Sequence, residues 1–249
     1  MASNPMQQFS VHKIGPEIKI AGIDLSFTNA SLFMVVSVAL ILLFLFLGTK
    51  ERKIIPDKIQ LLGELSYSFV SKMISDTAGS KAKPYFSFIF SLFMFVLFCN
   101  MFGMIPYSFT VTSHIIVTLI MALFIFIAVT IIGFIKHGFK YLSIFIPSGV
   151  PVVLLPLITV IEIISYLSRP VSLSVRLFAN MMSGHILLKV LLGFAWTMVM
   201  SGGIMILIHL VPMAVVFILL FLETAVAIIQ AYVFTILTCI YLNEALNLH

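Results

Sequence analysis

The sequence predicts an all-α integral membrane protein with about five membrane-crossing helices, one amphipathic surface helix and a final hairpin of two very long, tilted helices. Three observations predict this fold class. Hydrophobic residues make up 61% of the 249 residues and charged residues only 9%, and the mean hydropathy is +1.21. Such a composition is typical of chains that lie mostly in lipid. Apolar runs of about 20 residues also recur, and each is long enough to cross a bilayer.

We expect a single membrane domain over residues 1–249. Its first 30 residues contain no cleavable signal or transit pattern and are expected to form an outer-side N-terminal segment. The first span is predicted over residues 31–48, where an apolar run ends at the charged sequence KERK. Half of the 14 lysine and arginine residues then lie between residues 49 and 83. This charge marks a loop on the inner side.

An amphipathic helix is predicted within this basic loop, over residues 57–79. Leu62, Leu65, Phe69 and Met73 recur at helical spacing, and polar residues occupy the opposite face. This pattern is typical of a helix that lies on the membrane surface. The alternative is an ordinary amphipathic helix that packs against a partner protein.

Two further spans are predicted over residues 84–105 and 113–135. From Pro84 to Ile135 the only titratable charge is that of His114, and the sequence PYSFTVTS divides the region. A second basic loop follows at residues 136–141. Because basic loops alternate with uncharged ones, the positive-inside rule places both basic loops inside and the N-terminus outside.

Two very long helices are predicted over residues 148–200 and 204–245, joined by the SGG sequence at residues 201–203. In an antiparallel hairpin with this turn, residues at equal distances from the turn lie level with each other. Arg176 then lies level with Gln230, and His185 lies near Glu223. Ionisable residues inside a membrane are expected to face a partner, a water-filled cavity or a transport path.

Helical periodicity separates these polar residues into two environments. At 100° per residue, Glu162, Arg169 and Arg176 share one face of their helix, whereas His185 points to the opposite side. We therefore expect Arg176 to face another subunit, and His185 with Glu223 to line an aqueous path. For four further residues we expect no specific function. Arg169 and Lys189 are expected to reach the two membrane interfaces, and Glu244 and His249 to belong to a solvated terminus.

Two long motifs now carry a resemblance to a known family. The sequences RPVSLSVRLFANMMSGHILLKVLLGFAWT and ETAVAIIQAYVFTILTCIYLNEALNLH resemble subunit a of the rotary ATP synthases, in its alphaproteobacterial and mitochondrial branch. The similarity extends to NPMQQF near the start and to CNMFGMIPYSFTVTSHIIVT in the middle. The resemblance implies a stator subunit that provides two offset proton half-channels to a ring of c subunits.

The resemblance also implies roles in proton translocation for particular residues. The essential arginine of the family falls on Arg176, with Asn180 one turn further and the channel glutamine on Gln230. His185 and Glu223 fall on a pair whose residue types are exchanged in some other bacterial branches. The remaining matches are polar positions toward the inner side, at Glu162 and Ser172, and toward the outer half-channel, at Asn100 and His114.

The implied mechanism depends on a permanent charge. Because a guanidinium does not deprotonate at any relevant pH, Arg176 is a fixed cation and not a proton carrier. A ring carboxylate about 4 Å away would gain roughly 4 kcal/mol at an effective dielectric of 20 and release its proton. When it faces lipid, the carboxylate must be neutral. Arg176 also blocks a direct leak between the half-channels.

The implied partners are the c-subunit ring, the peripheral-stalk b subunits, other ATP synthase subunits and membrane lipid, in a bacterial or mitochondrial inner membrane. The chain is not expected to be catalytic alone or to bind a cofactor, a metal or nucleic acid. It contains neither GxxxxGK[ST] nor HExxH, so we expect it neither to bind ATP nor to act as a zinc protease. Two alternatives remain open. One is a free-standing proton-coupled transporter, and the other is a structural membrane anchor.

Overall fold

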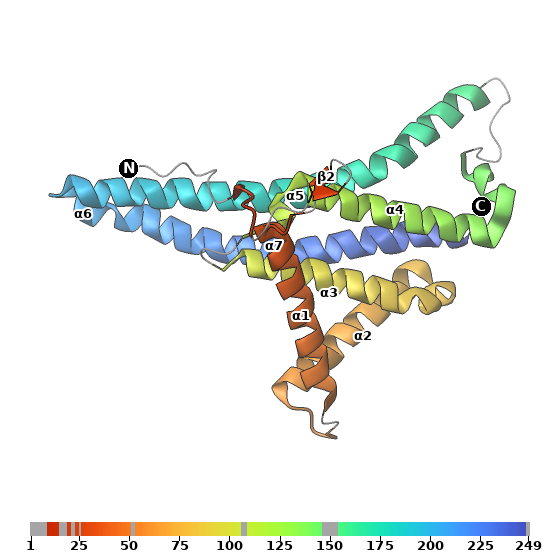
Figure 1. Cartoon of the computed structure of the whole chain (residues 1–249), viewed down its shortest axis with the longest axis horizontal. Helices are drawn as coiled ribbons and strands as arrows, with labels where there is room; N and C mark the ends of the chain where they lie inside the picture. Colours follow the sequence, from red (N-terminus) through yellow and green to blue (C-terminus); the bar gives the residue numbers. More distant parts are fainter. Residues whose placement is uncertain are drawn as a thin grey trace. The chain divides into compact units, whose positions relative to one another are not determined.

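A computed structural model describes the fold, which consists almost entirely of helices (Figure 1). Five helical segments are long and apolar enough to cross a membrane, so the predicted all-α membrane protein is confirmed. A small antiparallel hairpin, β1 (Lys19–Ile20) and β2 (Ile23–Asp24), precedes them. The structure describes residues 9–14, 19–20, 23–24, 26–50, 53–105, 109–145 and 154–247.

The first three membrane segments are single helices with short 3₁₀ extensions. Their apolar residues surround the whole helix, as expected for spans that contact lipid or other spans on every side. In chain order the elements are α1 (Asn29–Lys50), η2 (Ser80–Tyr85), α3 (Phe86–Gly103), η3 (Val111–Ser113), α4 (Ile115–His137) and η4 (Gly138–Phe145).

The last two membrane segments are the long helices expected from the sequence. α5 (Leu155–Ser201) has 47 residues and α7 (Leu210–Leu246) has 37, with the short α6 (Met205–Ile208) between them (Figure 1). At about 1.5 Å per residue, α5 extends for about 70 Å, more than twice the ~30 Å hydrocarbon thickness. α5 must therefore tilt strongly in a membrane or extend beyond it.

The turn between these helices lies at the predicted SGG sequence. Gly202 and Gly203 have φ values of +70° and +61°. This left-handed conformation costs little for glycine and is unfavourable for residues with a Cβ atom. The two glycines thus end α5 and reverse the chain.

The predicted amphipathic helix is α2 (Lys58–Ala78). Its apolar residues divide between two surroundings. Leu62 and Leu65 are 55% and 56% exposed, whereas Met73 and Ile74 are 6% and 1% exposed. The C-terminal part of the apolar face therefore packs within the chain, and Leu62 and Leu65 lie on the surface.

The described residues belong to two compact units, each assembled from segments far apart in the sequence. Aromatic contacts hold the second unit together: the ring of Phe69 in α2 lies 5.6 Å from that of Phe93 in α3 and 5.7 Å from that of Tyr232 in α7. The first unit comprises residues 1–41, 95–114 and 177–231, and the second comprises 42–94, 115–176 and 232–249.

Candidate functional site

The candidate site in the first unit is centred on a histidine–carboxylate pair. His185 on α5 and Glu223 on α7 approach to 3.6 Å between Nδ1 and Oε1. The side chains are 13% and 5% exposed, so both groups are largely removed from solvent. The hairpin register predicted from the SGG turn placed them near each other, and the structure brings them together.

Glu223 is a buried carboxyl group with few partners. Neither of its oxygens accepts or donates a hydrogen bond within the described part of the chain. The distance of 3.6 Å to His185 exceeds the length of a direct hydrogen bond. A buried carboxyl group without hydrogen bonds is costly, and such groups are characteristic of functional sites in membranes.

A glycine on α5 makes room for this carboxyl group. A Cβ atom built on Gly184 would lie 2.6 Å from Glu223 Oε1 and 2.8 Å from its Cδ. Any larger residue at position 184 would therefore displace the carboxyl group from its place beside His185. The sequence SGH thus combines the histidine with the space that its partner requires.

A cavity of about 220 Å³ adjoins Glu223 and is also lined by Asn180 and Ser183. Since one water occupies about 30 Å³ in the liquid, this volume has room for several waters. The cavity brings together two of the predicted site residues, Asn180 and Glu223. Its other lining residues are mostly leucines of α5 and α7.

Two further predicted residues lie in the same unit and have local roles in its packing. Asn100 is fully buried, and its Nδ2 donates a hydrogen bond of 3.1 Å to the backbone carbonyl of Ala227 on α7. The ring of His114 stacks on that of Phe109, with 4.8 Å between centroids. The hydrogen bond from Asn100 joins α3 to α7 at Ala227, which lies one helical turn after Glu223.

Thr110 is a buried neighbour of the pair that sequence reasoning missed. Its Oγ1 lies 3.1 Å from Nε2 of His185, and the residue is 5% exposed. Thr110 precedes η3 in the connection between α3 and α4 and lacks the helical periodicity that pointed to His185. The uncharged sequence PYSFTVTS carried no signal of this contact beyond its polar composition.

Arg176, the other ionisable residue expected from the sequence to be functional, belongs to the second unit. Arg176 on α5 is exposed and forms no hydrogen bond or ion pair with the described residues. Glu162 is partly exposed, and Ser172 is exposed, on the same helix. Gln230 on α7 belongs to the first unit, whereas Arg176 belongs to the second. The predicted position of Gln230 level with Arg176 therefore stays a prediction.

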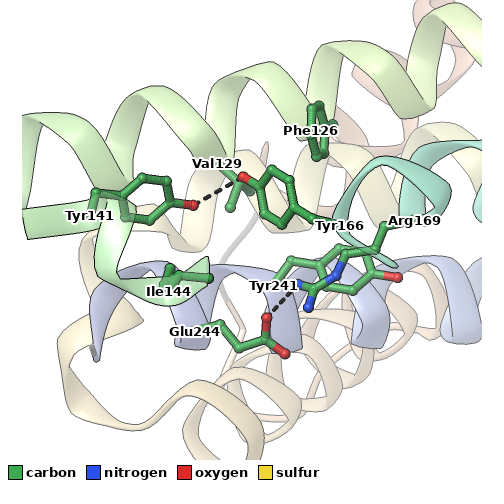
Figure 2. A pocket seen from close by; sticks show the side chains of 8 residues that line it. All are labelled: Phe126, Val129, Tyr141, Ile144, Tyr166, Arg169, Tyr241 and Glu244. Atoms are coloured by element: carbon green, nitrogen blue, oxygen red, sulfur yellow. Dashed lines mark hydrogen bonds and ion pairs between the residues drawn. The ribbon is translucent and has the colours of Figure 1, made fainter. Parts of the chain in front are cut away.

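A second polar cluster, in the second unit, corrects two expectations. Arg169 on α5 forms an ion pair with Glu244 near the end of α7 (Figure 2). Glu244 was expected in a solvated terminus; its side chain is 39% exposed but is held in this ion pair, so Arg169 does more than reach an interface. His249, which shared that expectation, lies outside the described residues. The Arg169 guanidinium also lies over the rings of Tyr166 and Tyr241, 5.3 Å and 5.0 Å from their centroids.

Hydroxyl groups extend this cluster to α4 and η4. The hydroxyl of Tyr166 lies 3.0 Å from that of Tyr141 (Figure 2). It also lies 2.7 Å from Thr130 Oγ1. The cluster encloses a cavity of about 10 Å³, which is about the size needed for one water. These contacts connect α4, η4, α5 and α7, and we interpret the cluster as stabilising the packing of these helices.

We predict that replacing Arg169 with glutamine destabilises the protein by about 1–3 kcal/mol, since it removes a partly exposed ion pair and two cation–π contacts. Thermal unfolding of the purified complex in detergent measures this loss. Arg169→Lys keeps the charge but loses the planar stacking, so it should fall between wild type and Arg169→Gln. Lys189→Gln, which removes an exposed cation from the same helix, is the matched control. Equal melting temperatures for Arg169→Gln and the control would remove the anchoring role.

Comparison with known proteins identifies the family. Residues 31–243 match the sequence model described as ATP synthase A chain. The chain belongs to the ATP synthase A chain family. The resemblance stated from the sequence motifs is thereby confirmed.

Curated relatives match this family assignment over almost the entire chain. The chain is 69% identical over 249 residues to "ATP synthase subunit a" of Pelagibacter ubique (strain HTCC1062), with both chains covered completely. It is 52% identical over 247 residues to the protein of that name from Chelativorans sp. (strain BNC1), covering 99% of each chain. It is 48% identical over 247 residues to that from Chondrus crispus, covering 99% of this chain and 97% of the relative. All the polar groups described above lie within the region aligned with the Pelagibacter ubique protein.

Proposed function

We propose that this ATP synthase A chain family member is the proton-conducting stator subunit of the complex, with two offset half-channels that open toward a c-subunit ring. Family membership supports ATP synthesis and proton transport in a multi-pass membrane protein, and it implies other ATP synthase subunits as partners. The finer assignments, to the c ring and the peripheral-stalk b subunits in a bacterial or mitochondrial inner membrane, belong to the proposal. So does the single membrane domain.

The exposed Arg176 is the observation that carries the proposal. A guanidinium in a membrane-crossing helix is costly unless a counter-charge or water compensates it. Arg176 has no ion-pair partner among the described residues, and this supports the proposal that a carboxylate of another subunit is its counter-charge. A ring carboxylate that passes Arg176 is ionised there and becomes neutral in lipid, and this difference couples proton transfer to rotation.

The proposed outer half-channel leads to the His185–Glu223 pair. Both side chains can take up and release protons where water reaches them, and the adjoining cavity of about 220 Å³ supports access by water. We assign Asn100 and His114 to the outer end of this path, and Asn180 and Gln230 to the region next to Arg176. Glu162 and Ser172 are assigned to the inner half-channel.

A free-standing proton-coupled transporter is the alternative. Such a transporter would need its own titratable carboxylate beside Arg176, and the described residues supply no ion pair there. A structural anchor would need neither the buried carboxyl group of Glu223 nor its cavity. The exposed, unpaired arginine therefore favours the stator.

Purification and reconstitution test the stator role. A tagged chain extracted in mild detergent is expected to co-purify with a ring-forming small subunit that carries a membrane carboxylate. In liposomes, passive proton conduction driven by a potassium diffusion potential should require both components. Conduction by the chain alone would favour the transporter, and a chain that binds the ring without any conduction would favour the anchor.

A further inference from the structure

Thr110 contacts both His185 and a backbone carbonyl, and the two contacts together favour one tautomer of His185. Thr110 Oγ1 donates its single proton to the backbone carbonyl of Gly103, at 3.4 Å. Gly103 is the last residue of α3, and its carbonyl oxygen can accept hydrogen bonds but not donate them. The hydroxyl has one proton and the Gly103 carbonyl can only accept, so both contacts are hydrogen bonds at the same time only when Nε2 of His185, 3.1 Å from Oγ1, carries a proton.

We infer that Thr110 is a positioning residue that holds neutral His185 as the Nε2–H tautomer, with the lone pair of Nδ1 aimed at Glu223. The chain of groups runs from the Gly103 carbonyl through the Thr110 hydroxyl to the imidazole, and all of it lies in one compact unit. The histidine thereby offers a proton acceptor, and not a donor, to the carboxyl group that lies 3.6 Å from Nδ1.

This tautomer determines which nitrogen of His185 exchanges a proton with Glu223, and each transfer step can run in either direction. The proton of a neutral Glu223 carboxyl group passes to Nδ1, which leaves a carboxylate next to an imidazolium. Release of the Nδ1 proton to water then restores the neutral Nε2–H ring, because the hydrogen bond to Thr110 retains the other proton. Transfer requires the two side chains to approach by roughly 0.5 Å, since 3.6 Å is longer than a hydrogen bond.

Close packing at Gly103 keeps Thr110 in place. A Cβ atom on Gly103 would lie 2.6 Å from Thr110 Cγ2 and 3.1 Å from its Oγ1. Alanine at position 103 should therefore push the hydroxyl away from His185. By contrast, a Cβ atom on Gly193 of α5 meets no described atom within 4 Å, so Gly193→Ala is a matched control.

Nitrogen-15 NMR of the histidine-labelled complex in lipid tests the tautomer directly. The signals of His185 are assigned by difference from a His185→Gln sample, at pH 8, where an imidazole with an ordinary pKa of about 6.5 is neutral. The wild type should show a protonated Nε2 and an unprotonated Nδ1. Thr110→Val and Gly103→Ala should give a mixture of both tautomers, whereas Thr110→Ser and Gly193→Ala should retain the wild-type signals.

Three results would overturn the inference: an Nδ1–H tautomer in the wild type, an imidazolium at pH 8, or unchanged signals in Thr110→Val. The link to proton relay rests on the proposed function and has a separate readout. Loss of one hydrogen bond should slow passive proton conduction roughly fivefold in Thr110→Val, with recovery in Thr110→Ser. A changed tautomer with unchanged conduction would support the role of Thr110 and count against His185 as a relay.

Discussion

Membranes that contain Arg176→Ala are expected to make no ATP in response to a proton gradient, although the subunit still assembles. Arg176 is exposed and has no ion-pair partner among the described residues, so its loss leaves neither a cavity nor an unpaired charge within the chain. The ring carboxylate, in contrast, loses the only fixed cation that the proposed mechanism provides for its ionisation. ATP synthesis after an acid–base jump and native-gel analysis of assembly measure the two effects.

Lysine is expected to rescue this function poorly. A lysine ammonium is compact, strongly hydrated and able to lose its proton when buried, whereas a guanidinium stays charged. Val175→Ala is the matched control, because Val175 is adjacent and 43% exposed and carries no charge. The control should retain ATP synthesis. Normal synthesis by Arg176→Ala membranes would contradict the proposed mechanism.

Exchange of the residue types at positions 185 and 223 is expected to restore proton pumping that either single substitution impairs. His185→Glu places two carboxyl groups close together, where repulsion disfavours ionisation of both. Glu223→His pairs two imidazoles and leaves no acid. Each single variant should pump protons roughly tenfold or more slowly, since a positioned acid or base is lost. The double variant again has one acid and one base within reach.

ATP-driven proton pumping in vesicles from all four variants measures the coupling between the two positions. If the residues act as a pair, the double variant should pump at least about fivefold faster than the product of the single defects predicts. A second cycle that combines His185→Glu with Glu244→Gln serves as the control, because Glu244 pairs with Arg169 instead. If the pumping rate of the double variant is reduced by the product of the two single reductions, His185 and Glu223 act independently.

The fold class, the five spans and the hairpin turn all follow from the sequence alone. Long apolar runs and their length of about 20 residues define membrane spans without tertiary information, because lipid requires every backbone polar group to bond within its own helix. The contact between His185 and Glu223 was also predictable. Both lie on helices joined by one glycine turn, so their distance from that turn and the constant helical rise determine their level.

The other side-chain contacts become visible only in the folded chain. Thr110 reaches His185 from an irregular connection, where no period relates sequence position to direction. Arg169 and Glu244 lie several positions out of the predicted register, yet they form an ion pair, and the Arg169 guanidinium also lies over the rings of Tyr166 and Tyr241. The space for Glu223 depends on the missing side chain of Gly184. Such contacts arise from side-chain volume and from close packing between segments that are distant in the sequence. The hydrophobic pattern of the sequence does not specify which individual atoms touch.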